Sequence, residues 1–159
     1  MSTTPPRFAE LIGQVTAAIA ERSVEPALGT FLNARFPFDG ALVSELAELC
    51  VVGRQEGWLC AREQDGVRFG RPIKPGPASH GFSVDVVDMD RVVGPHHRHP
   101  RGEIDLVMPQ DARASFDGLH QGWLVYGPTS SHFPTVAGGR ALVLYLLPGG
   151  AIEFTGAGA

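Results

Sequence analysis

Glycine and proline divide the chain after residue 53 into short apolar runs, and this spacing limits the possible folds more than any other feature. Most of the Gly and Pro residues lie in this part, and the runs between them are rich in Val, Phe, Leu and Trp. Each run has about five to eight residues, the length of a typical strand. We therefore expect strands near residues 57–62, 67–71, 81–88, 103–108, 112–116, 122–126, 132–136 and 140–147.

The turns between these runs favour a mainly β fold. Gln64-Asp65-Gly66 and Phe116-Asp117-Gly118 are hairpin turn sequences. Many short strands joined by turns are typical of a closed barrel or a sandwich rather than of alternating strands and helices. Residues 140–147 are apolar on both alternating faces. We expect the barrel interior to cover one of these faces and helices or a second subunit to cover the other.

The N-terminal part has the pattern of one or two helices. Apolar residues recur at intervals of three and four from Phe8 to Ile19, which is the stripe of an amphipathic helix. Glu25-Pro26 interrupts this pattern. A second helix is expected from about residue 40 to residue 52, with Asp39 as a candidate N-cap.

A length of 159 residues corresponds to one domain. We interpret residues 1–54 as a helical segment that packs on a small β-barrel formed by residues 55–154. A homodimer is expected, because a second subunit is one candidate cover for the apolar strand at residues 140–147.

Charge and composition exclude several classes of partner. The net charge is −4, Lys74 is the only lysine, and the arginines are spread along the chain, so a phosphate-binding surface is not expected. No window approaches the roughly 20 apolar residues of a membrane span, and the first residues do not resemble a secretory signal. Cys50 and Cys60 form no CxxC pair. We expect a cytoplasmic protein that binds neither nucleic acid nor membranes.

A histidine cluster is the strongest indication of chemistry. Three of the six histidines fall within residues 96–99. In an extended strand, residues two apart share a face, so His97 and His99 point one way and His96 the other. After a short turn, Glu103 begins the next apolar run, with Asp105 on the same face. Two imidazoles on one strand and a carboxylate beyond a turn supply three ligands of a metal site.

A fourth ligand has to come from another strand, and His132 is the candidate. It follows the turn-like segment at residues 127–131 and begins an apolar run. A mixed set of nitrogen and oxygen ligands suits one divalent transition metal, and Fe, Mn, Zn, Ni and Cu all remain open.

These motifs resemble the cupin superfamily. The spacing His-x-His-x3-Glu at His97 matches the first cupin motif, and Gly122, Pro128 and His132 match the second, in which Ser130 stands where glycine is expected. The resemblance covers roughly residues 55–150. It implies a small β-barrel whose mouth holds one metal through three histidines and a glutamate.

A narrower resemblance extends over nearly the whole chain. The helical N-terminus, the run His-Pro-x-Gly-Glu-Ile-Asp and the run Gly-Pro-x-Ser-x-His are similar to the 4-hydroxylaminobenzoate lyase family. This resemblance implies a lyase of nitroarene breakdown that converts 4-hydroxylaminobenzoate, a small aromatic carboxylate, to 3,4-dihydroxybenzoate and ammonia. The N–O bond supplies the two oxidising equivalents, so neither nicotinamide nor flavin is required.

Five further residues are candidates for this chemistry. Asp105, Tyr126 and His96 are candidate proton carriers. Arg101 is a candidate for binding the substrate carboxylate through its guanidinium fork, and Trp123 for contacting the ring. A tryptophan in a strand is also an ordinary core residue, and His96 is expected on the face turned away from the metal.

Two other functions use the same ligand set. One is an iron-dependent cupin dioxygenase that acts on a small aromatic or thiol substrate, and it would need oxygen where the lyase does not. The other is a non-catalytic cupin that binds a small molecule without turnover.

Overall fold

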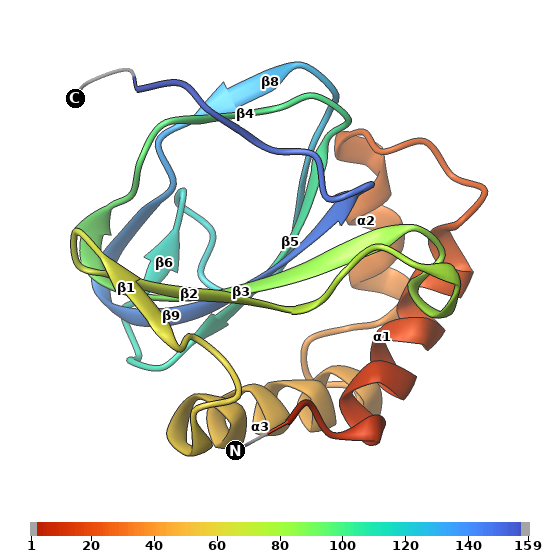
Figure 1. Ribbon diagram of the computed structural model, residues 1–159, viewed down its shortest axis with the longest axis horizontal. Coiled ribbons are helices and arrows are strands. Elements are labelled where there is room, and N and C mark those ends of the chain that lie inside the picture. The colour runs from red at the N-terminus through yellow and green to blue at the C-terminus, as the bar shows by residue number, and fades with distance from the viewer. Residues whose placement is uncertain (1–2, 157–159) are drawn as a thin grey trace.

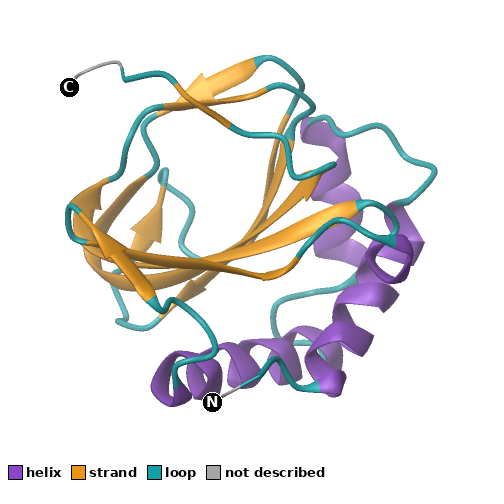
Figure 2. Cartoon of the chain, viewed as in Figure 1, coloured by secondary structure: helices purple, strands orange, loops and turns teal. Residues whose placement is uncertain are grey.

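Three helices precede the strands and cover one face of the larger sheet (Figures 1 and 2). The computed structural model describes residues 3–156. The helices are α1 (Pro6–Ile19), α2 (Pro26–Arg35) and α3 (Ala41–Glu56). No helix in this part of the chain is both long and apolar enough to cross a bilayer.

The first helix confirms the predicted amphipathic stripe, since its apolar residues from Phe8 to Ile19 are buried. Helix α2 was missed by the sequence prediction, because Pro26 was taken as a break. It is instead the first helical residue, where its missing N–H removes no helical hydrogen bond. The expected cap of α3 was also wrong. Gly40, not Asp39, is the N-cap, and its carbonyl accepts the hydrogen bond from Ser44 N–H.

The strands form two sheets, so the predicted mainly β fold is confirmed. The larger sheet has the order β1-β2-β3-β9-β5-β7, with β6 paired to β9, and the smaller has the order β10-β4-β8. A short 3-10 helix, η1 (Pro77–Ser79), precedes β3. The strands are β1 (Arg62–Gln64), β2 (Val67–Ile73), β3 (Phe82–Val93), β4 (His97–His99), β5 (Glu103–Pro109), β6 (Ser115–Phe116), β7 (Gly122–Tyr126), β8 (Ser130–His132), β9 (Thr135–Pro148) and β10 (Glu153–Phe154).

The strands do not close into a continuous barrel, and the two sheets form an open jelly-roll sandwich instead. Within residues 3–156, no ladder joins the two sheets. Two of the crossings between the sheets lie at Pro95, between β3 and β4, and at Pro134, between β8 and β9, and neither residue has the N–H that a continuing ladder would need. Figure 1 shows the smaller sheet, with β4 and β8, above the larger one.

Both predicted hairpin turns are present. Gln64 pairs with Val67 across Asp65-Gly66, and Phe116 bridges to Leu119 across Asp117-Gly118. The two central residues of each turn have positive φ angles, of 52° and 82° in the first and 49° and 86° in the second. Asp-Gly is favoured in such turns because both residue types tolerate this conformation.

The larger sheet has two buried faces with different roles. On β9, Leu142, Leu144 and Leu146 pack against the helices, whereas Val143 and Tyr145 lie in a second apolar cluster on the opposite face. The prediction that residues 140–147 are covered on both faces is confirmed, and helices supply the outer cover. Fully burying a leucine side chain contributes about 1.5–3 kcal/mol, so this strand anchors the fold.

Candidate metal centre

Strands from both sheets bring the four predicted ligands together. Strand β4 carries His97 and His99, and its antiparallel pairing with β8 places His132 directly opposite His97. Glu103 is the first residue of β5 in the larger sheet. One ligand atom from each of the four residues lies within 4.8 Å of the others.

The ligand atoms converge in a buried space. Glu103 Oε1 lies 3.2 Å from Nε2 of His97 and 3.2 Å from Nε2 of His99, and His132 Nε2 lies 3.5 Å from Glu103 Oε2. The side chain of His132 is 11% exposed, and those of His99 and Glu103 are fully buried. The arrangement therefore has one partly exposed side, at His132.

Each imidazole is held through its Nδ1 atom, which leaves Nε2 free to bind a metal. His97 Nδ1 contacts the Pro95 carbonyl at 3.3 Å, and His132 Nδ1 contacts an Asp117 carboxylate oxygen at 2.5 Å. Both partners accept hydrogen bonds, so both Nδ1 atoms donate. His99 Nδ1 contacts the Ser130 hydroxyl at 2.9 Å. That hydroxyl donates its own hydrogen to the Gly127 carbonyl and therefore accepts from His99.

This arrangement fits a divalent cation. Nε2 of His97 and Nε2 of His132 are only 3.1 Å apart, although both Nδ1 atoms already carry hydrogens. Nε2 of His99 and Oε2 of Glu103 are buried and make no hydrogen bond within residues 3–156. Converging donor atoms in a buried site are costly unless a cation lies between them. Three imidazoles and one carboxylate suit Fe, Mn, Zn, Ni or Cu.

The charges of the ligands agree with this fit. Burial raises the pKa of Glu103, but contacts with the imidazoles of His132, His97 and His99 outweigh it and hold the pKa well below its usual value. Burial lowers the pKa of His132, but Asp117 and Glu103 outweigh it and raise the pKa to about 9. A metal that binds His132 therefore displaces a proton.

A tight turn places Glu103 beside the histidines. Gly102 has a φ of +93° and donates its N–H to the His99 carbonyl. A Cβ atom there would lie 2.5 Å from a methyl group of Val24 and 2.9 Å from the Tyr126 carbonyl oxygen. Glycine is therefore required between the second histidine ligand and the glutamate, for both its conformation and its size.

Asp105 is brought to the same interior face as Glu103. It is fully buried, and neither of its carboxyl oxygens has a hydrogen-bond partner among the described residues. Burial, followed by repulsion from Glu103, raises the pKa of this carboxyl group well above its usual value. Asp105 is thus a buried carboxyl group beside Glu103 whose surroundings favour the protonated form.

Tyr126 is also brought to the site, and it reveals a residue that the sequence prediction missed. Its ring lies 4.5 Å from the ring of His132, between centroids, and its hydroxyl donates to Asp117 Oδ2 at 2.5 Å. Burial, followed by the hydrogen bond to Asp117, raises the pKa of Tyr126. The sequence indicated Asp117 only as a turn residue, and nothing local to the sequence indicates that its carboxylate contacts a ligand.

Three other candidates are not brought into this group. His96 contacts the Thr155 hydroxyl at 2.6 Å and the ring of Phe133, away from the ligands. Arg101 is exposed in the turn between β4 and β5. Trp123 is 3% exposed in the core beneath the helices, and its indole N–H donates to the Phe36 carbonyl.

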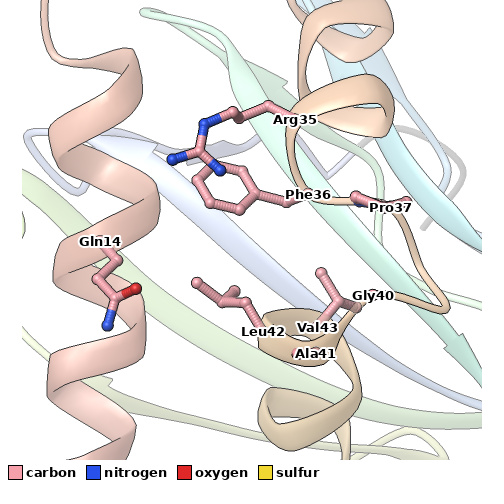
Figure 3. A pocket seen from close by; sticks show the side chains of 8 residues that line it. All are labelled: Gln14, Arg35, Phe36, Pro37, Gly40, Ala41, Leu42 and Val43. Carbon is pink, nitrogen blue, oxygen red and sulfur yellow. The ribbon is translucent and has the colours of Figure 1, made fainter.

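A cavity of about 260 Å³ lies elsewhere, among the three helices (Figure 3). Gln14 of α1, Arg35 of α2 and Val43 of α3 are among its lining residues, and none of the candidate site residues is. This cavity therefore does not belong to the candidate metal centre.

The open two-sheet fold and the group of three histidines and one glutamate define a cupin with a candidate metal centre. The sequence profile of the 4-hydroxylaminobenzoate lyase family (PnbB) matches residues 10–154. The chain belongs to this family.

Two 4-hydroxylaminobenzoate lyases agree with this assignment. The 4-hydroxylaminobenzoate lyase of Nocardioides sp. (strain LMS-CY) is 31% identical over 86% of this chain and 86% of its own. The enzyme of the same name from Pseudomonas putida is 27% identical over 91% of this chain and 94% of its own. Among solved structures, an oxalate oxidase in complex with the substrate analogue glycolate matches 58% of this chain and 57% of its own, with 22% identity and a TM-score of 0.45.

Proposed function

We propose that this protein is a metal-dependent lyase that converts 4-hydroxylaminobenzoate to 3,4-dihydroxybenzoate and ammonia. The observation that carries the proposal is the family match over residues 10–154, together with two relatives of that name that align along most of their length. The converging ligand atoms support the metal requirement. The homodimer and the cytoplasmic location stay predictions.

The proposed reaction consumes one water molecule overall. The N–O bond of the hydroxylamine breaks, and its oxygen leaves as water after protonation. One water molecule then adds to the ring carbon next to the nitrogen-bearing carbon. A second hydrolyses the resulting imine and releases ammonia, and loss of a ring proton gives the diol. Cleavage of the N–O bond oxidises the ring, so the reaction requires no external oxidant.

The four ligands would hold the metal through their inward-facing atoms. A bound divalent metal supplies Lewis acidity and lowers the pKa of a coordinated water. The hydrogen bonds at Nδ1 of His97, His99 and His132 keep each Nε2 directed at the same point. The protein therefore contributes a preorganised donor set that needs no rearrangement before it binds the ion.

Asp105 is the residue that we propose to move protons. A protonated carboxyl group can donate to the departing oxygen and then accept a proton from the attacking water. Its full burial beside Glu103 supports this role, because both burial and the neighbouring carboxylate favour the protonated form. Tyr126 donates its hydroxyl hydrogen to Asp117, so we do not assign it a proton-transfer role. It would instead align the ring of His132 and the edge of the substrate.

For the substrate carboxylate we keep Arg101 as the proposed partner. Arg101 is an exposed residue in the turn that links the histidine strand to Glu103. An arginine fork binds a carboxylate through two parallel hydrogen bonds. We do not include Trp123 or His96 in the proposal, because the first is a core residue and the second contacts Thr155.

An anaerobic assay tests the proposed function. Metal-loaded protein is mixed with 4-hydroxylaminobenzoate without oxygen, and ammonia and 3,4-dihydroxybenzoate are measured together. We expect equal amounts of both products, and none from His97→Ala protein. Turnover only when oxygen is admitted would favour a dioxygenase, and tight substrate binding without products would favour a binding protein. Either result would reject the lyase.

A further inference from the structure

Asp117 joins three parts of the site through one carboxylate. Its Oδ2 atom accepts hydrogen bonds from His132 Nδ1 and from the Tyr126 hydroxyl, each at 2.5 Å. Its Oδ1 atom accepts from the backbone N–H of Thr135 at 2.9 Å. The side chain is 12% exposed. Asp117 therefore contacts the end of β7, the end of β8 and the start of β9 at once.

The turn alone does not require a carboxylate at this position. Asp117 and Gly118 are the central residues of a hairpin turn with positive φ angles. Asparagine is favoured in the first position of such turns as strongly as aspartate is. The negative charge is thus an additional feature of the residue, and it lies against the most exposed of the three candidate ligand histidines.

We propose that Asp117 is the positioning residue for the ligand His132. By accepting the Nδ1 hydrogen, the carboxylate fixes the ring orientation and directs Nε2 toward the metal. A carboxylate partner also makes the imidazole a stronger electron donor than a neutral partner does. Because Tyr126 shares the same oxygen, the orientation of its hydroxyl depends on Asp117 as well. The backbone bond to Thr135 holds the carboxylate in place.

The substitution Asp117→Asn removes the negative charge of this side chain and keeps the residue compatible with the turn. Asparagine keeps the turn conformation, but it has a single acceptor oxygen in place of two. Either Thr135 or the pair of His132 and Tyr126 then loses its acceptor. The matched control is Asp65→Asn, which changes the same residue type at the same position of the other hairpin turn, where the side chain is exposed.

Metal affinity is the readout, because it does not depend on turnover. Metal-free protein is titrated with Co²⁺, and both the dissociation constant and the visible absorption of the bound ion are recorded. We expect Asp117→Asn to weaken Co²⁺ binding by about 10- to 100-fold and to change the absorption spectrum. Asp65→Asn should bind as the wild type does. Thermal unfolding of each metal-free variant shows that the compared proteins are folded.

Equal affinity and an unchanged spectrum in Asp117→Asn would overturn the proposal. If that variant does not fold, Asp117→Gly is measured instead, since glycine adopts the same φ without strain. Wild-type protein that binds no Co²⁺ would reject the metal centre itself, and with it the role of Asp117. If the protein binds Co²⁺ normally but the lyase assay fails, the proposed substrate is rejected, and the metal centre and the role of Asp117 still stand.

Discussion

His99 donates its Nδ1 hydrogen to the Ser130 hydroxyl over 2.9 Å, and that hydroxyl donates in turn to the Gly127 carbonyl. The two bonds fix the tautomer of a fully buried ligand. Ser130 stands where the second cupin motif is expected to have glycine. The departure from the motif therefore supplies a hydrogen-bond partner for a candidate metal ligand.

Loss of the Ser130 hydroxyl should weaken metal binding. In Ser130→Ala, the Nδ1 hydrogen of His99 has no side-chain acceptor, and the ring is free to rotate or to change tautomer. We expect the metal dissociation constant to rise about tenfold, measured by competition with a chelator. Ser131→Ala is the matched control, because Ser131 lies on the same strand with an exposed side chain. Equal affinities in the two variants would contradict this account.

Replacing Asp105 should separate catalysis from metal binding. Asp105→Asn removes the acidic proton and keeps the size of the side chain. We expect kcat for ammonia release to fall about 100- to 10,000-fold, the usual contribution of a general acid or base. The metal content should stay at the wild-type value, as measured by elemental analysis. Wild-type kcat in this variant would remove Asp105 from the reaction.

An ion pair outside the site gives a prediction about acid stability. Asp88 is 7% exposed and contacts Arg54 at 2.7 Å and Arg140 at 2.8 Å. Burial raises the pKa of Asp88, but the hydrogen bonds from Arg140 and Arg54 outweigh it and lower the pKa. The stabilisation is therefore present above the unfolded pKa of about 3.9 and is lost as the pH falls through the lower folded value.

The variant Asp88→Asn tests this dependence. The side chains of Arg54 and Arg140 are about one-third exposed, so solvent weakens both ion pairs. We expect a loss of about 1–3 kcal/mol in the free energy of unfolding at pH 7. The difference from the wild type should shrink as the pH approaches about 3. Urea unfolding of both proteins across this range is the measurement. A difference that stays constant with pH would show that charge does not cause it.

Strand parity explains why much of the candidate site was predictable. Residues two apart on a strand share a face, so the sequence alone placed His97 with His99 and Glu103 with Asp105. The contacts of Asp117 were not predictable in this way. They join the turn after β6 to the ends of β7 and β8, and no local pattern encodes the packing of these ends.

The position of Trp123 could not be predicted because helix α2, which covers it, was missed in the sequence. Its face of β7 is covered by α2, and its indole N–H reaches the carbonyl of Phe36 at the end of that helix. Only two apolar side chains of α2, Leu28 and Leu32, are buried, so the helix has no clear apolar stripe in the sequence. Without the helix, the face of β7 that carries Trp123 could not be assigned to the core.

The most direct test of the central claim is the activity of the protein without and with its metal. The chain is stripped of metal with a chelator, and ammonia release from 4-hydroxylaminobenzoate is followed while one divalent metal is added back. We predict no activity at the start and a linear recovery that ends at about one ion per chain, as four ligands around one point require. Full activity in the metal-free protein would contradict the account.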